Sequence, residues 1–417
     1  MTERLASPSP PTDGRRVALA AALAGIVFLL AFAVVHHGFY HRDIIVDTGL
    51  YQDYGDAVLA GKVPYRDFRL EYPPGALPVF ILPALGHAHK TAFHRYNQEF
   101  QLVMAVCALA ALAFMAIALR ALGDGTWRLA GALGVAAAAP LLLGSVVLYR
   151  FDLWPAMLTV GALAAILAGR ERLGSGVLAL GAAAKLYPVL LLPPVLNYVW
   201  RRSGRREALL CSGVFAAVLV VCFGPFLVLA PGGVWHSVAG QIDRPLQLES
   251  LGAALLLAAH HLFGYGLTAR TSHGSQGLAG PGADTVAAVT TAIELAGIIG
   301  VWIWFARGPA DRERLVRAFA AATCVFVAFG KVLSPQFLIW LVALVPLVRG
   351  RRGLAASGLL ALALVLTQLW FPHHYWALAL HFNARASWLV LARDLVLVLL
   401  VGALVFASPW RREPARS

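Results

Sequence analysis

Charged residues are scarce in this chain of 417 residues. Asp, Glu, Lys and Arg make up 13% of it, against roughly 25% in ordinary soluble domains, while 59% of the residues are hydrophobic. A soluble fold of this length could not bury so much apolar surface. The scarcity of charge therefore excludes a soluble globular protein and predicts a polytopic membrane protein.

Cysteine is scarce as well. The four cysteines all lie in apolar runs and none forms a C-x-x-C pair, so the sequence contains neither a disulfide framework nor a cysteine zinc site. There is no D-x-D motif either. Histidine occurs in pairs beside predicted helix ends, where interfacial histidine is the simpler interpretation, at His36–His37, His260–His261 and His373–His374. We expect no metal and no cofactor.

Long apolar runs, by contrast, are abundant. Ten of them have the composition of membrane helices: 17–35, 97–119, 128–149, 153–169, 207–230, 284–306, 315–333, 335–349, 354–371 and 387–407. With two shorter helices between 169 and 207, they predict an all-α fold, a polytopic transmembrane bundle of about 12 helical elements.

Two segments are predicted to form helix pairs that return to the side from which they start. Arginines flank both ends of 169–207, so both ends face one side, and we predict two short helices that meet at Lys185-Leu186-Tyr187-Pro188, where proline lacks a backbone donor. Segment 315–349 predicts a hairpin with 331–336 at its tip. A single transmembrane domain then spans 17–407, between a disordered cytoplasmic tail at 1–16 and a second cytoplasmic tail at 408–417.

The net charge of +13 is an orientation signal. The predicted inner side holds 21 arginines and eight acidic residues, whereas the remaining 13 basic and 13 acidic residues balance on the outer side. Both termini are therefore expected in the cytoplasm, with the chain in the plasma (inner) membrane. The arginines are dispersed over short loops without a folded basic domain, which excludes nucleic acid as a partner.

Two large loops lie on the predicted outer side, at 37–96 and 231–283. In the first, 50–60 has helical character and is expected to lie in the interface. Pro-Pro-Gly opens an apolar element at 75–85 that is too short to span, so a re-entrant or an interfacial helix is expected there. In the second, the Gly- and Ser-rich segment 269–283 looks disordered, and two interpretations stay open: a lid over a site, or a passive linker. Polar residues gather in these loops rather than at mid-membrane, which predicts a site at the outer face.

Several motifs in these loops are specific when taken together. They are Asp47 followed by Tyr51 and Tyr54, G-x-x-P-Y-x-D-F at 61–68, E-Y-P-P-G at 71–75, Arg150-Phe151-Asp152, the Lys185–Pro188 turn, R-P-L-Q-L-E-S at 244–250, and Ser334-Pro335-Gln336-Phe337 with Trp340. Over about 16–407 the chain resembles the polyprenol-phosphate-sugar-dependent glycosyltransferases of the GT-C fold. It is most similar to glycosyltransferase family 87, the bacterial α-mannosyltransferase group.

The resemblance implies a membrane hexosyltransferase of the cell envelope, with 17–407 as its catalytic domain. Its donor would be polyprenyl-phosphate mannose, its acceptor a glycolipid or glycan, and its partners otherwise membrane lipids. Asp47 matches the family's general base in an inverting single displacement. A departing phosphate needs cations, and Lys185, Lys331, Arg150 and Arg244 lie at predicted outer ends. The full set of candidate substrate-binding residues is Asp43, Tyr51, Glu71, Arg150, Asp152, Lys185, Tyr187, Arg244, Gln247, Glu249, Lys331 and Gln336.

Plainer interpretations stand beside these. Asp47 could cap a helix, with Asp43 as the rival base, and Glu71 could brace its loop. Arg150 and Asp152 could pair with each other, and Lys185 could extend to the interface. Glu294, Arg393 and Asp394 lie in apolar runs, where structural pairing is the default. The rival functions are a lipid-linked-sugar flippase or other transporter, and a non-catalytic lipid-binding scaffold. The acceptor, and mannose against a pentose, stay open.

Overall fold

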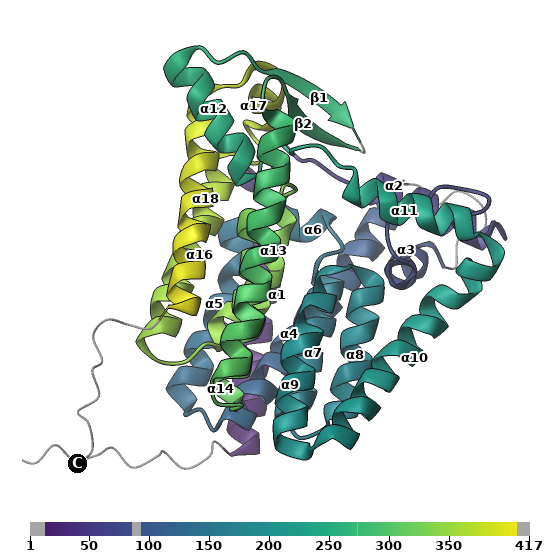
Figure 1. Ribbon diagram of the computed structural model, residues 1–417, viewed down its shortest axis with the longest axis vertical. Helices are drawn as coiled ribbons and strands as arrows, with labels where there is room; N and C mark the ends of the chain where they lie inside the picture. The colour runs from purple at the N-terminus through teal and green to yellow at the C-terminus, as the bar shows by residue number, and fades with distance from the viewer. Residues whose placement is uncertain (1–12, 86–92, 273, 407–417) are drawn as a thin grey trace, which may run out of the picture.

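The computed structural model describes residues 13–85, 93–272 and 274–406, and it confirms the all-α bundle (Figure 1). Within these residues seven helices are long and apolar enough to cross a membrane: α1 (Gly14–Val34), α4 (Phe93–Leu122), α5 (Thr126–Leu143), α10 (Arg205–Leu229), α13 (Ala283–Arg307), α16 (Gly350–Trp370) and α18 (Ala384–Val405). The chain is thus a multi-pass membrane protein. The predicted tails lie almost wholly outside the described residues, except that α1 begins at Gly14 rather than at Val17.

Further helices complete the bundle. They are α6 (Val146–Tyr149), α7 (Leu153–Leu167), α8 (Glu171–Ala184), α9 (Leu192–Ser203), α14 (Arg312–Phe329) and α15 (Leu338–Leu344), with the 3-10 turns η4 (Tyr187–Leu191), η5 (Pro335–Phe337) and η6 (Val345–Leu347). Both predicted hairpins are confirmed. The helix α8 ends just before Lys185, because Pro188 cannot donate to the preceding turn. The helix α14 ends at Phe329, and Pro335 then opens the turn η5 that leads into α15.

Arginines tie helix ends together at one end of the molecule, which we call the arginine-rich end. Arg349 pairs with the buried Asp124 at 2.7 Å and also with Glu313, while Arg172 pairs with Glu207 at 2.6 Å. Other arginines donate to the last carbonyls of helices, where they complement the helix dipole: Arg201 to Ala306, Arg312 to Ala121 and Arg317 to Leu404. The helix-to-helix turns at this end are short.

The opposite end, at the top of Figure 1, carries the two large loops. The first contains η1 (Gly38–His41), α2 (Thr48–Leu59), η2 (Pro74–Ala76), α3 (Leu77–Ile81) and η3 (Leu82–Ala84), so both predicted short helices are confirmed. The second contains α11 (Pro231–Ile242), α12 (Leu251–Phe263), β1 (Thr268–Ser272) and β2 (Ser275–Ala279). The short helix α17 (Tyr375–His381) joins them from the third large turn.

The Gly- and Ser-rich segment 269–283 contains two paired strands, which corrects its disordered appearance in the sequence. Strands β1 and β2 pair antiparallel from Thr268–Ala279 to Ser272–Ser275. An isolated two-stranded hairpin is marginal in water, but here the segment before α12 extends the sheet. The Leu248 amide donates to the Gln276 carbonyl at 3.0 Å, and the Leu278 amide donates to the Leu246 carbonyl at 2.9 Å.

Candidate active site

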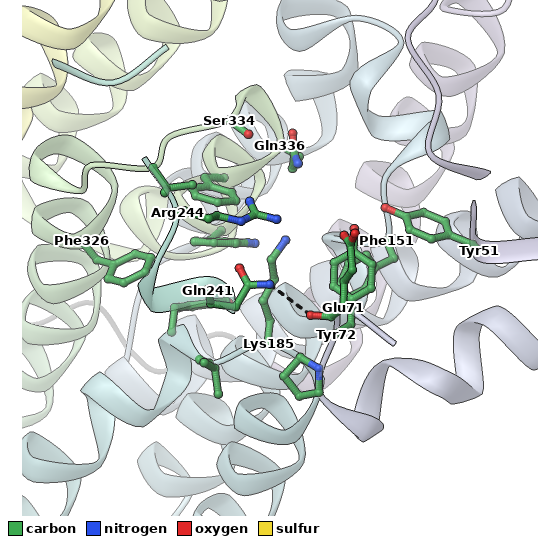
Figure 2. Close-up of a pocket in the computed structure, with 16 residues that line it drawn as sticks. Tyr51, Glu71, Tyr72, Phe151, Lys185, Gln241, Arg244, Phe326, Ser334 and Gln336 are labelled. Atoms are coloured by element: carbon green, nitrogen blue, oxygen red, sulfur yellow. Dashed lines mark hydrogen bonds between the residues drawn. The ribbon is translucent and has the colours of Figure 1, made fainter. Parts of the chain in front are cut away.

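A cavity of about 200 Å³ opens between the loops and the helix ends beneath them (Figure 2). Segments far apart in the sequence meet there: the first loop, the turns at 150–152 and 185–188, α11, and the turn between α14 and α15. Its lining is Tyr51, Glu71, Tyr72, Pro73, Phe151, Lys185, Leu186, Tyr187, Gln241, Arg244, Phe326, Val332, Ser334, Gln336, Phe337 and Trp340. Six of the predicted substrate-binding residues are among them, namely Tyr51, Glu71, Lys185, Tyr187, Arg244 and Gln336.

Lys185 is held in this cavity by a buried carboxylate. Its Nζ donates to Asp152 Oδ1 at 2.6 Å, and Trp340 Nε1 donates to the same oxygen at 2.8 Å. The ammonium also lies 4.8 to 5.1 Å from the ring centroids of Phe151, Phe337 and Trp340, close enough for cation–π attraction. These contacts fix the cation in the cavity instead of letting it extend to the membrane interface.

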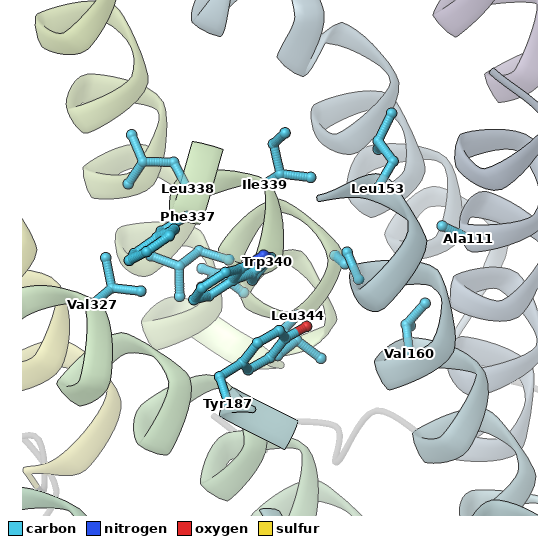
Figure 3. Close-up of a cluster of buried hydrophobic side chains, with 14 of the residues drawn as sticks. Ala111, Leu153, Val160, Tyr187, Val327, Phe337, Leu338, Ile339, Trp340 and Leu344 are labelled. Atoms are coloured by element: carbon cyan, nitrogen blue, oxygen red, sulfur yellow. The ribbon is translucent and has the colours of Figure 1, made fainter. Parts of the chain in front are cut away.

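The floor beneath Lys185 is a stack of aromatic rings set in the apolar core (Figure 3). Trp340 stacks on Tyr187 at 4.1 Å and on Phe337 at 4.3 Å between ring centroids. The Tyr187 hydroxyl bonds with the Thr159 hydroxyl at 2.8 Å, which ties the η4 turn to α7. The predicted break at Tyr187–Pro188 therefore has a structural role: it carries a rigid support for the lysine.

Asp47 lies at the start of α2 but does not cap the helix. Its side chain makes no cap hydrogen bond and instead pairs with the guanidinium of Arg150. Since Asp152 pairs with Lys185, the alternative pairing of Arg150 with Asp152 is not the one formed. Neither Asp47 nor Arg150 lines the cavity. They belong to a series of alternating charges, Asp47, Arg150, Asp152 and Lys185, in which only Lys185 lines the cavity.

The segment after α11 braces one wall. Arg244 lines the cavity, whereas Gln247 and Glu249 are buried behind it. Gln247 Nε2 donates to Glu249 Oε2 at 3.2 Å and to Ser334 Oγ at 2.9 Å, which links the second large loop to the turn before α15. Burial raises the pKa of the Glu249 carboxyl to about 8, although Arg393 and Arg150 favour its ionised form.

Two predicted residues lie away from the cavity. Lys331 does not line it, because its Nζ donates to the Ile242 carbonyl at 2.6 Å and so ties the end of α11 to the α14–α15 turn. Asp43 is exposed and pairs with His373 at 2.8 Å.

The buried pair Arg393–Asp394 in α18, at 2.7 Å, has the structural role expected for charges in an apolar run. Within the described part of the chain, no three His, Cys, Asp or Glu residues form a group that could hold a metal ion.

Gln241 is a site residue that sequence reasoning missed. Its Nε2 donates to the Glu71 carbonyl at 3.1 Å, drawn as the dashed line in Figure 2, and it joins α11 to the first loop. The sequence signal that could have identified Gln241 is its position as a polar residue in the last turn of a helix, directly before the 244–250 motif. Glu71 itself faces the cavity, and a Cβ built on Gly274 of the hairpin would lie 4.0 Å from Glu71 Oε1.

Comparison with known families agrees with this constellation of motifs. The model of glycosyltransferase family 87 matches residues 70–335, which include the 71–75, 150–152, 185–188 and 244–250 motifs. The model of the PIG-M mannosyltransferases matches residues 271–408, over the last helices of the bundle. The search of curated proteins finds no match.

Proposed function

Because the chain belongs to glycosyltransferase family 87, we propose that it transfers mannose from polyprenyl-phosphate mannose to a glycolipid or glycan at the outer face of the plasma membrane. The cavity that gathers the first loop, Lys185 and Arg244 is the observation that carries this proposal. A membrane glycosyltransferase needs one site that both a lipid-borne donor and an aqueous acceptor can reach. This cavity lies at the loop-bearing end, where both can meet.

The phosphate of the donor fits the cations of the cavity. Lys185 and Arg244 both line it, and Arg150 and Arg244 are near enough to repel the Lys185 ammonium electrostatically. An anion between them would relieve this repulsion and accept charge-assisted hydrogen bonds. The same contacts would stabilise the negative charge that develops on the phosphate as it leaves the sugar.

The polyprenyl tail has a path from the bilayer. An apolar groove of about 430 Å³ opens between α3, α7, α8 and α10, and it is lined by Pro74, Gly75, Leu77, Pro78, Ile81, Leu82, Trp154, Leu180, Cys222 and Phe226. A small cavity shares Pro73 and Leu186 with the polar cavity, and its lining residues Pro73 and Phe223 are sequence neighbours of Pro74 and Cys222 in the groove. The tail would lie in the groove, along the largely exposed α10, with its phosphate at Lys185.

We assign the general base to Asp47 in a single displacement that inverts the donor's β linkage. The acceptor hydroxyl attacks the anomeric carbon, its proton passes to the Asp47 carboxylate, and the bond to the phosphate breaks. Arg150 beside Asp47 favours the ionised carboxylate that a base requires. Glu71 is the rival carboxylate, because it lines the cavity and Asp47 does not.

The test uses purified protein in lipid nanodiscs with radiolabelled polyprenyl-phosphate mannose and cell lipids. Wild type is expected to transfer the sugar, D47N to lose at least about 100-fold in rate, in keeping with typical contributions of a general base, and E71Q to lose less. If D47N transfers as fast as wild type, the base is not Asp47, and a loss confined to E71Q gives that role to Glu71. If wild type transfers nothing but moves the lipid across vesicles, the protein is a transporter. If wild type binds the donor but neither transfers the sugar nor moves the lipid, the protein is a non-catalytic lipid-binding scaffold.

A further inference from the structure

A second and larger cavity, of about 800 Å³, lies between the first loop and α11. Its lining is Leu50, Tyr54, Tyr65, Arg69, Leu70, Glu71, Gly233, His236, Ser237, Ala239, Gly240, Gln241, Asp243 and Arg244. Glu71, Gln241 and Arg244 also line the cavity at Lys185, so the two spaces share one wall. The volume is within the range of roughly 300 to 1,000 Å³ usual for small-molecule sites.

The backbone around this cavity is shaped to keep it open. One face of α11 carries the small residues Ser237 and Gly240, which leave room above the helix. At Gly233 the helix approaches the first loop so closely that any Cβ would collide with the Tyr65 carbonyl. Tyr65 has a φ of 67°, rare for a residue other than glycine, and its hydroxyl donates to the Tyr72 carbonyl at 2.6 Å. Strain of this kind is most often kept at functional sites.

The chemistry of the lining fits an uncharged carbohydrate. Arg69 and Arg244 are balanced by Glu71 and Asp243, so neither an anionic head group nor a cation finds an excess of opposite charge. A hydrocarbon tail would remove these polar groups from water, which costs free energy. A sugar offers many hydroxyl donors and acceptors for them, and its apolar faces can pack against the rings of Tyr54 and Tyr65.

We propose that this cavity is the acceptor site and that it binds the uncharged sugar end of the acceptor glycan. The proposal rests on the proposed function, which it deepens by giving donor and acceptor separate spaces. An acceptor hydroxyl reaching the shared wall at Glu71 and Gln241 would face the anomeric carbon of a donor whose phosphate is at Lys185. Its oxygen forms the new glycosidic bond, its proton goes to the base, and the electrons of the broken bond leave with the phosphate.

The experiment measures binding of an uncharged probe, octyl α-mannobioside, to the full-length protein in nanodiscs by calorimetry without donor. Ser237→Trp fills the cavity, and Ile242→Trp adds the same ring to the same helix on its exposed side, where Ile242 is 63% exposed. We expect wild type and I242W to bind equally and S237W to bind at least ten-fold more weakly. Hydrolysis of polyprenyl-phosphate mannose by water, measured without acceptor, is expected to be the same in wild type and I242W, which shows that the added ring by itself does not disturb the donor site.

Equal binding by S237W and wild type would overturn the acceptor site, as would binding that is lost in K185M but not in S237W. Displacement of the probe by phosphatidylinositol vesicles, but not by free mannobiose, would show an anionic lipid site instead. If S237W does not fold, S237V, which replaces the hydroxyl with two methyl groups, must weaken binding at least three-fold. If the protein binds the mannobioside but transfers no sugar, the carbohydrate site is supported and the proposed function is wrong.

Discussion

At the scale of single residues, the site depends on which carboxylate pairs with which cation. Asp152 is almost wholly buried, and it accepts from both Lys185 and Trp340 through one oxygen. A buried charge whose partner is removed is left uncompensated, which costs far more than the loss of an exposed pair. Asp152 is therefore a positioning residue: it aims the lysine without occupying the cavity itself.

Replacing Asp152 with Asn is expected to destabilise the protein by about 3 to 5 kcal/mol, because the Lys185 ammonium loses its buried counter-charge. Thermal unfolding in detergent micelles measures the change. The double variant D152N/K185M should recover much of the stability without recovering transfer activity. Asp67→Asn is the control, since its pair with Arg66 at 2.8 Å is exposed and its loss should change little. Equal unfolding midpoints for D152N and D67N would contradict the buried-pair argument.

The raised pKa of Glu249 predicts a pH dependence of stability. A carboxyl whose folded pKa is about 8, against an ordinary value of 4.5, binds its proton more tightly in the folded protein. The stabilisation of the folded protein by this protonated carboxyl is therefore fully present below about pH 4.5 and is lost as the pH rises through 8. The Glu249→Gln variant cannot ionise, so it should gain in unfolding temperature relative to wild type between pH 5 and pH 8. Parallel curves for the two proteins would show that Glu249 is ionised throughout.

At the scale of elements, the β-hairpin links the outer loops. Strand β2 pairs with the 246–248 segment, whose neighbour Arg244 lines both cavities, and Gly274 lies beside Glu71. A hairpin attached in this way holds the second loop against the first. Of the two interpretations left open by the sequence, this attachment favours a cover over the site rather than a passive linker.

Gly277→Val is expected to weaken this attachment, since a Cβ there would lie 3.0 Å from the Leu246 carbonyl oxygen and 3.1 Å from Pro245 Cγ. Transfer activity should fall at least about ten-fold while the unfolding midpoint of the bundle changes little, because local opening can occur without global unfolding. Faster hydrogen exchange at the Leu248 and Leu278 amides would report the opening. Gly266→Val is the matched control, because a Cβ at Gly266 meets nothing within 4 Å. Wild-type activity in G277V would mean that the hairpin is dispensable.

At the scale of the whole molecule, arginine gathers at one end. Ion pairs and arginines that donate to helix carbonyls hold the arginine-rich end together. The other end carries the loops and the hairpin (Figure 1), and both cavities are lined by residues of these loops. From the positive-inside rule we expect the arginine-rich end in the cytoplasm and the cavities outside.

Labelling of single cysteines tests this orientation. Ala269→Cys lies on the exposed face of β1, and Ser203→Cys lies in the exposed last turn of α9 at the arginine-rich end. A membrane-impermeant maleimide added to intact cells should label A269C and spare S203C until the membrane is opened. The native cysteines are the background, and three of the four are buried. The reverse labelling pattern would place the cavities in the cytoplasm and exclude a donor on the outer leaflet.

The sequence by itself determined the helices and their breaks, and it predicts their direction across the membrane. Apolar runs fix where the chain can cross a bilayer, Pro188 and Pro335 fix where it turns back, and arginine counts separate its two sides, because each of these signals is local. The motifs also predicted most of the polar cavity, including Lys185 and Arg244.

Only the tertiary structure decided which residues meet. Lys185 lies 33 positions after Asp152 in the sequence, and Trp340 lies 188 positions after it. Helix packing that no local pattern encodes brings these residues together. The same holds for the pairing of Asp47 with Arg150, for the hairpin's attachment to 246–248, and for the second cavity beside α11. Pairing and empty space depend on how distant helices approach one another, and that is set by the balance of the whole core rather than by any one segment.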